Sequence, residues 1–258
     1  MVHLPTTTVI LGIGLLLCGT APAFAACDDL PDHAAVQSAL KESVAPSGGP
    51  ANGGFDLHMW ASLVDRDGVV CVVAFSGEDR DDQWPGSRVI SAQKANTANA
   101  FSNSNLALST ANLFSAVQPG GSLHGLQHSN PVDPRVAYRG NAKAYGTERD
   151  PMNGLKIGGV NVFGGGLALY SQEDGKTVLG GLGVSGDTSC ADHNIAWRLR
   201  AALGFTRVPS GVNTGSGAPS KGDDNIIYDI TNGVSASGFG HSQGCPGTPT
   251  VPASNVTN

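Results

Sequence analysis

The stretch that decides the fold is residues 56–75, DLHMWASLVDRDGVVCVVAF. Two apolar runs rich in β-branched and aromatic residues, 56–64 and 69–75, flank the polar segment Asp65-Arg66-Asp67-Gly68. An Asp-Gly pair tolerates the positive φ angles of a tight turn, so this pattern predicts a β-hairpin. A hairpin implies an antiparallel sheet, on which we expect helices to pack.

Other segments extend the sheet and supply the helices. Apolar runs predict three more strands, over 157–162, 167–171 and 177–184, with the turn signal Glu173-Asp174-Gly175 between the last two. Helical spacing predicts helices over 31–44, 87–103, 109–118 and 188–203. The order αββααβββα predicts an α/β fold of the α+β type, a two-layer sandwich with an antiparallel sheet and helices packed on it.

The first 25 residues predict export. An apolar run from Val9 to Cys18 precedes Ala23-Phe24-Ala25, which places small residues at the positions that signal peptidase recognises. The run is shorter than the roughly 20 apolar residues of a transmembrane helix. We therefore expect a signal peptide over 1–25, no transmembrane segment, and a periplasmic or secreted mature chain.

The mature chain divides into two parts. A domain is expected over residues 26–205, and a C-terminal extension rich in Gly and Ser over 206–258. Within that extension only residues 225–230 have the composition of a strand, so most of it is expected to lie on the surface. Before it, residues 122–155 form a long segment with three prolines and no clear periodicity, which is typical of a loop that is either functional or partly disordered.

The charge balance argues against nucleic acid as a partner. The chain has 15 Lys and Arg against 21 Asp and Glu, a formal net charge of −6 at pH 7. A phosphate-binding surface needs clustered basic residues, and here they are few and scattered.

Four cysteines remain once Cys18 leaves with the signal peptide: Cys27, Cys71, Cys190 and Cys245. An even number in an oxidising compartment favours disulfides, and four cysteines allow three connectivities. Structural zinc is the alternative, but the sequence contains no CxxC pair. We expect a Cys190–Cys245 disulfide, because Cys190 opens the last helix and Cys245 lies in a tail that needs a fixed point.

A glycine-rich motif, Gly181 to Gly186, has the spacing GxGxxG between a strand and a helix. Dinucleotide binding also requires a βαβ unit and an acidic residue about 20 positions later, and neither is present. Close packing of the strand on a helix is the favoured interpretation. Ser185 is not expected to be a nucleophile, because Asp187 stands where the nucleophile elbow needs glycine.

Two histidines, His124 and His128, lie four residues apart in a loop with apolar neighbours. Neutral imidazole is a common ligand of iron, including haem iron, so the pair is a candidate metal site. The alternative is that each histidine hydrogen-bonds the backbone of its loop. On the preceding long helix, Lys94, Thr97 and Phe101 share one face at spacings i, i+3 and i+7.

Several segments together resemble the GlcG/HbpS haem-binding family, also called the haem-degrading domain family. The matching pieces run in the same order over residues 30–205 and include the hairpin turn, the helix segment 94–101, the loop 118–121, the pair Gly158-Gly159 and the segment 178–188. The sequence departs from the family at Asp187, in a longer loop over 131–153, and in the additional tail. The resemblance implies an antiparallel sheet with helices, assembly into a homo-oligomer, and haem binding by some members, with axial ligands that differ between them.

The leading hypothesis is an exported protein that binds or sequesters haem. Its pocket is expected between the loop of His124 and His128 and the helix face of Lys94, Thr97 and Phe101, where Lys94 would meet a haem propionate. Two alternatives stay open. One is an enzyme of the same fold that acts oxidatively on haem or on another small organic substrate. The other is a structural or sensor-partner module whose function is assembly.

Overall fold

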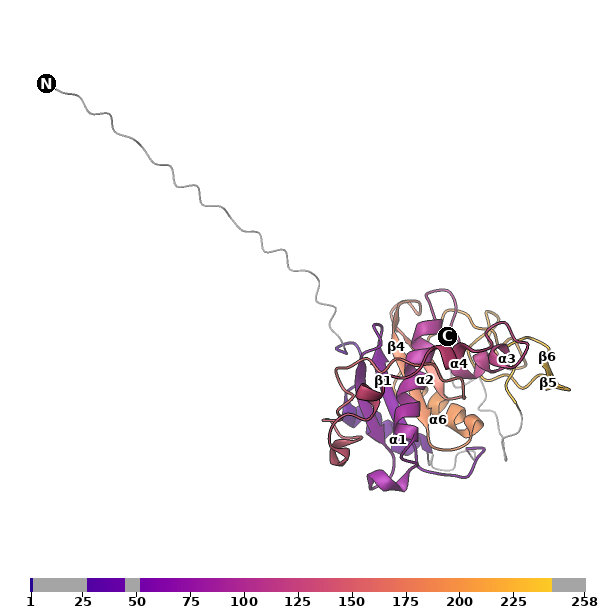
Figure 1. The fold of residues 1–258 in the computed structure, drawn as a ribbon. Coiled ribbons are helices and arrows are strands. Elements are labelled where there is room, and N and C mark those ends of the chain that lie inside the picture. Colours follow the sequence, from indigo (N-terminus) through magenta and orange to yellow (C-terminus); the bar gives the residue numbers. More distant parts are fainter. Residues whose placement is uncertain (2–26, 45–51, 243–258) are drawn as a thin grey trace.

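A four-stranded antiparallel sheet forms the centre of the protein (Figure 1). The structure is a computed structural model that describes residues 1, 27–44 and 52–242. The strand order is β2-β1-β4-β3. The strands are β1 (Trp60–Asp65), β2 (Val70–Phe75), β3 (Gly166–Tyr170) and β4 (Val178–Ser185).

The predicted hairpin of residues 56–75 is confirmed as β1 and β2, which pair with Trp60 opposite Phe75. In the turn, Gly68 has a φ of 78°, a conformation that glycine adopts without a steric penalty. The Asp65 carboxylate accepts hydrogen bonds from the amides of Asp67 and Val69, both at 2.9 Å. The turn therefore satisfies its own backbone donors and fixes the register of the hairpin.

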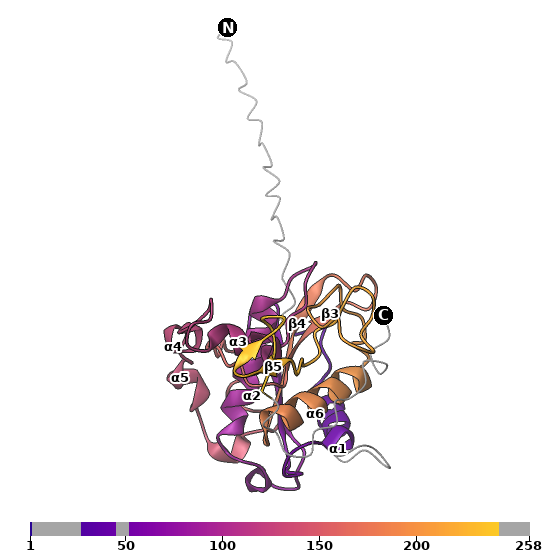
Figure 2. The same cartoon turned by 90° about the vertical axis from the view of Figure 1, so that its right-hand side faces the viewer.

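Helices cover both faces of the sheet (Figure 2). On β1, Ala61 and Leu63 face the layer formed by α1 (His33–Val44) and α6 (Ser189–Ala202). Trp60 and Val64 face the opposite layer, formed by α2 (Ser87–Phe101). The predicted class, an antiparallel sheet with helices packed on it, is confirmed, although the layers number three rather than two.

The glycines of β4 explain how closely α2 approaches the sheet. A Cβ atom on Gly183 would collide with the backbone of Ser91 and Ala95, and one on Gly181 with the carbonyl of Ala95. Only a residue without a side chain fits at these two positions. The GxGxxG motif is thus a packing feature, as its favoured interpretation predicted, and the helix that it receives is α2.

The predicted strand over 157–162 is wrong. Gly158 makes an isolated bridge with Val132, and Lys156, just before the segment, makes one with Val69. Gly158 and Gly159 have positive φ angles of 63° and 78°. An extended strand cannot continue through two such residues. The helix predicted over 109–118 is present as a 3₁₀ turn over Thr110–Leu113 followed by α3 (Phe114–Val117). The segment 122–155, predicted to be irregular, contains three short helical elements: α4 (Leu126–Ser129), α5 (Pro134–Ala137) and a 3₁₀ turn over Ala142–Ala144.

The described part of the C-terminal tail, up to Ser242, is anchored in the domain at residues 222–226 and 240–241, which are buried, whereas residues 214–217 and 231–234 are exposed. Arg200 of α6 and Asp224 form an ion pair in which both side chains are fully buried. His241, also buried, bonds through Nε2 to the Ser189 hydroxyl at 2.7 Å. A small hairpin of β5 (Ile230–Thr231) and β6 (Val234–Ser235) replaces the strand expected over 225–230.

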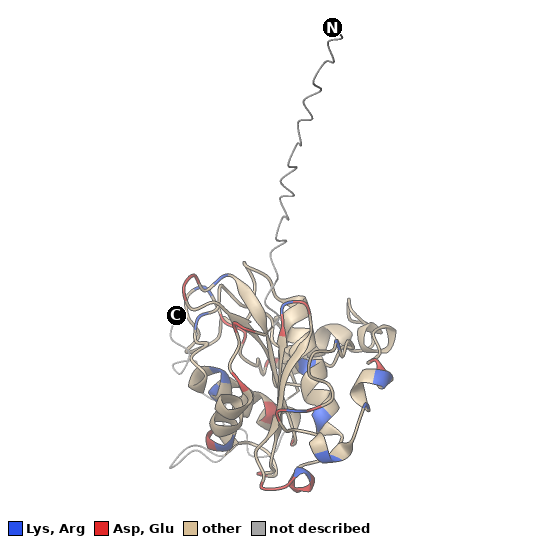
Figure 3. Ribbon diagram, turned by 90° about the vertical axis from the view of Figure 1, so that its left-hand side faces the viewer, with Lys and Arg blue, Asp and Glu red and all other residues tan. Residues whose placement is uncertain are grey.

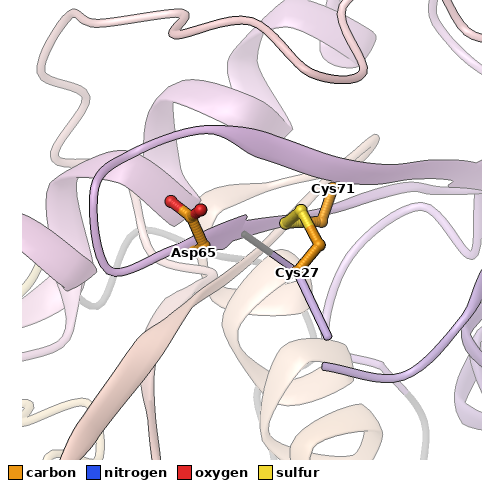
Figure 4. Close-up of side chains that lie close together, drawn as sticks. All are labelled: Cys27, Asp65 and Cys71. Atoms are coloured by element: carbon orange, nitrogen blue, oxygen red, sulfur yellow. A yellow bond between two sulfur atoms is a disulfide. The ribbon is translucent and has the colours of Figure 1, made fainter. Parts of the chain in front are cut away.

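A disulfide joins Cys27 to Cys71 of β2, with the two Cα atoms 5.5 Å apart (Figure 4). It ties the start of the described chain to the sheet. Cys190 is disulfide-bonded as well. Its predicted partner, Cys245, lies outside the described residues, so the Cys190–Cys245 pairing stays a prediction. The signal peptide predicted over 1–25 also lies outside them, except for residue 1.

None of the helices within the described residues combines the length and the apolar character needed to cross a membrane. Basic and acidic residues are interspersed along the ribbon (Figure 3).

Candidate functional site

Lys94 lies between the two helical layers instead of lining a pocket. Its ammonium is fully buried and donates to the Asp192 carboxylate at 2.6 Å and to the Val184 carbonyl at 2.9 Å. Burial raises the pKa of Asp192 to about 6 and lowers the pKa of Lys94, so pairing only partly offsets the cost of desolvation. The pair joins α2 to α6 beside Val184 of β4, and its ammonium has no surface exposed to solvent.

Thr97 also has a structural role, because its hydroxyl hydrogen-bonds the backbone of two other residues. Its hydroxyl donates to the Gln93 carbonyl at 2.7 Å and accepts from the amide of Asn161 at 3.0 Å. The side chain is fully buried. Thr97 therefore holds the segment after Gly159 against α2, and its oxygen has no face open to a cofactor.

Phe101, the third residue of the predicted face, does reach the loop of the two histidines. It belongs to what we call the α3–α4 apolar cluster, in which partly buried side chains cover a small buried core. The core consists of Leu113, Val117 and Val162, and the partly buried members are Phe101, Leu108, Leu123, Leu126 and Val160. Figure 2 shows α3 and α4 side by side next to α2. The cluster is the one place where Phe101 and the loop of residues 123–128 meet.

His124 is exposed at the edge of this cluster, just before α4. Its Nδ1 lies 3.3 Å from the Val117 carbonyl. A carbonyl can only accept, so Nδ1 carries the proton of the neutral ring and Nε2 keeps its lone pair. Gly125, with a φ of 89°, lets the chain turn immediately into α4.

His128 lies in α4 and is exposed. Within the described residues its ring makes no hydrogen bond. No third His, Cys, Asp or Glu side chain in these ranges lies close enough to form a metal site together with His124 and His128. The one compact group of such side chains in the described ranges is Cys27, Asp65 and Cys71, whose two sulfurs are bonded to each other (Figure 4).

Two clefts lie away from the α3–α4 apolar cluster. Neither is lined by any of the predicted site residues, which are Lys94, Thr97, Phe101, His124 and His128. The first, about 690 Å³, lies between the loop Gln118–Ser122 and the β5–β6 hairpin. Its lining offers hydroxyl, amide and apolar groups but no imidazole, thiol or charged side chain, so it has no strong donor for iron. The second, about 670 Å³, lies between α1 and residues 141–149.

Several residues with chemical interest were not singled out from the sequence. His193 and His241 are buried and bond to the tail and to α6, and burial lowers the pKa of both rings, that of His193 to about 3. Lys143 and Arg149 line the second cleft. Both residues fall in the segment 122–155, which is typical of a loop that is either functional or partly disordered, so the sequence indicated this region but not the two side chains.

Several solved structures resemble the chain, and three of them are as follows. The Klebsiella pneumoniae protein ORFY is 24% identical over 67% of this chain and 90% of that chain, with a TM-score of 0.43. PduOC in complex with haem is 23% identical over 69% of this chain and 98% of that chain, with a TM-score of 0.46. HbpS is 18% identical over 67% of this chain and 86% of that chain, with a TM-score of 0.42. No curated protein matches the sequence. A family model described as "Haem degrading protein HbpS-like" matches residues 52–200, which is more than half of the chain. The protein therefore belongs to the HbpS-like family.

Proposed function

We propose that this protein is exported and binds haem on the α3–α4 apolar cluster, with His124 as the iron ligand. The observation that carries the proposal is the hydrogen bond from His124 Nδ1 to the Val117 carbonyl. Histidines that bind metals usually donate their second ring nitrogen to a carbonyl or carboxylate, which fixes the tautomer and orients the ring. In His124 the nitrogen left with a lone pair is Nε2, and the ring is exposed.

The surroundings fit a flat, mostly apolar ligand. Phe101, Leu123 and Leu126 are partly buried and present apolar surface next to His124. Haem would cover such surface and exclude water from the iron ligand. The residues do not fit a buried propionate, because Lys94 is paired with Asp192. The propionates would therefore face solvent, and sequestration of haem, rather than deep enclosure, is the function that this surface supports.

The family description gives haem degradation as a second candidate. Haem bound on an open surface is accessible to reductant and oxygen, which degradation requires. Incubating the haem complex with ascorbate in air and following the visible spectrum tests this candidate. Loss of the Soret band together with a biliverdin-like product supports degradation, whereas an unchanged spectrum supports sequestration.

Titration of haemin into single variants tests the proposed ligand. His124→Ala should weaken binding at least about tenfold and shift the Soret maximum, as expected when a charged or metal-bonded contact of more than 1.4 kcal/mol is lost. His58→Ala is the matched control, because His58 is also exposed and also makes one hydrogen bond through Nδ1, to Ser76 at 3.2 Å. His128→Ala tests whether the neighbouring histidine, rather than His124, binds the iron. A His124→Ala titration that matches the parent would contradict the proposal.

A further inference from the structure

The cleft between α1 and residues 141–149 has the features of a second binding site. It measures about 670 Å³, within the range of small-molecule pockets. Its lining combines an imidazole, two cations and apolar side chains. The full lining is His33, Ala34, Gln37, Phe75, Asn141, Lys143, Ala144, Gly146, Thr147, Glu148 and Arg149.

The wall made by residues 141–149 is held in place by a buried ion pair. Asp150 receives hydrogen bonds from Arg88 Nε at 2.8 Å and from the Gly146 amide at 2.7 Å. The Arg88 guanidinium also lies over the Tyr145 ring, 3.6 Å from its centroid. Arg88 and Asp150 are both buried, so the ion pair anchors the segment at its C-terminal end and at Tyr145 and Gly146.

Close backbone contact fixes the same wall to the sheet. Gly146 has a φ of 76°, and a Cβ atom there would collide with the rings of Phe75 and Trp60. Those two rings meet edge to face, with centroids 5.4 Å apart. Phe75 thus forms an apolar surface in the cleft that is itself packed on a rigid neighbour.

The cations in the cleft have no internal partner. Among the described residues, neither Lys143 nor Arg149 has a carboxylate oxygen within 4.0 Å, and both side chains are exposed. Glu148 lines the cleft as well, so two positive charges face one negative charge. The balance favours a ligand with a single carboxylate.

His33 supplies directional recognition. Its Nε2 lies 2.8 Å from the Gly146 carbonyl, so in the neutral ring Nε2 carries the proton and Nδ1 is an acceptor. An acceptor beside an apolar wall and a pair of cations selects a ligand that has a donor, such as a hydroxyl, as well as an acid group.

We propose that this cleft binds a small aromatic carboxylic acid bearing a hydroxyl group. Lys143 and Arg149 hold the carboxylate, Phe75 contacts the ring, and His33 Nδ1 accepts from the hydroxyl. The site is separate from the α3–α4 apolar cluster, so it does not depend on haem binding.

Calorimetric titration of the full mature chain with 4-hydroxybenzoate tests the site, with the neutral isostere 4-hydroxybenzamide as the control ligand. The parent should bind the acid at least about tenfold more tightly than the amide, because charge-assisted hydrogen bonds are the stronger class. The double variant Lys143→Gln/Arg149→Gln should lose that preference. Both positions are exposed, so folding is not at risk. Lys176→Gln, an equal charge change at an exposed lysine that does not line this cleft, should behave as the parent.

A steric variant gives an independent readout. Ala34 lines the cleft and is exposed on α1, so Ala34→Trp should block 4-hydroxybenzoate while leaving haemin binding unchanged. Equal affinity for acid and amide in the parent, or a preference that survives in the double variant, overturns the proposal. Competition between haemin and 4-hydroxybenzoate overturns the separation of the two sites.

Discussion

The ion pair between Arg200 and Asp224 allows a direct test of whether the tail is part of the folded domain. The two guanidinium nitrogens Nη1 and Nη2 donate to the two carboxylate oxygens at 2.7 and 2.8 Å, and both side chains are fully buried. Arg200 cannot lose its proton. Replacing Asp224 by Asn therefore leaves a buried, uncompensated positive charge, which costs about 3–5 kcal/mol of unfolding free energy.

Urea unfolding at pH 7 measures this cost. With a slope of about 2–3 kcal/mol per molar urea, the midpoint for Asp224→Asn should fall by about 1–2.5 M. The double variant Arg200→Met/Asp224→Leu removes both charges and replaces them with apolar volume, so it should be more stable than Asp224→Asn alone. A urea midpoint for Asp224→Asn within about 0.3 M of the parent value would refute the reasoning, because it would show that Asp224 is not buried against Arg200.

Four further predictions concern processing, cross-linking, acid stability and assembly. The exported chain should begin at Ala26, and its intact mass tests this; a mass matching lipidated Cys18 would contradict it. Peptide mapping without reductant should find Cys190 joined to Cys245, and Cys245 bonded to any other cysteine would sink the pairing. Burial lowers the pKa of His193 to about 3, below its usual 6.5, so its protonation favours the unfolded chain. The corresponding stability should be complete above pH 6.5 and fall by up to about 1.4 kcal/mol per pH unit toward pH 3. His193→Gln should make urea midpoints less dependent on pH over that range, and an unchanged dependence would count against the assignment. Light scattering at micromolar concentration should give a multiple of the chain mass, and a monomer mass would contradict the expected homo-oligomer.

The parts of the fold that were predictable are those set by local chemistry. The Asp-Gly turn at Gly68 predicted the hairpin, and Thr188 caps α6 by accepting from the Ala191 amide at 3.2 Å, as expected from its position. The apolar composition of residues 157–162 predicts a strand. The prediction fails at Gly158 and Gly159, because the positive φ angles of these two glycines interrupt an extended backbone, and apolar composition does not reveal them.

The candidate site was predictable only where exposure and neighbours follow from sequence spacing. Phe101 and the loop of His124 do share a cluster, as the helix face and the apolar flanks indicated. Helical periodicity could not show that the face carrying Lys94 turns inward, since its partner Asp192 is 98 residues away in the sequence. The same limit applies to His33, whose partner Gly146 is 113 residues away.

The most direct test of the central claim is chemical rescue of the proposed iron ligand. His124→Gly should bind haemin without the Soret position of the parent complex, and added imidazole should restore that position because it supplies the missing nitrogen donor. His58→Gly should bind haemin with the Soret position of the parent complex before any imidazole is added. If His124→Gly already shows the parent spectrum without imidazole, His124 is not the ligand.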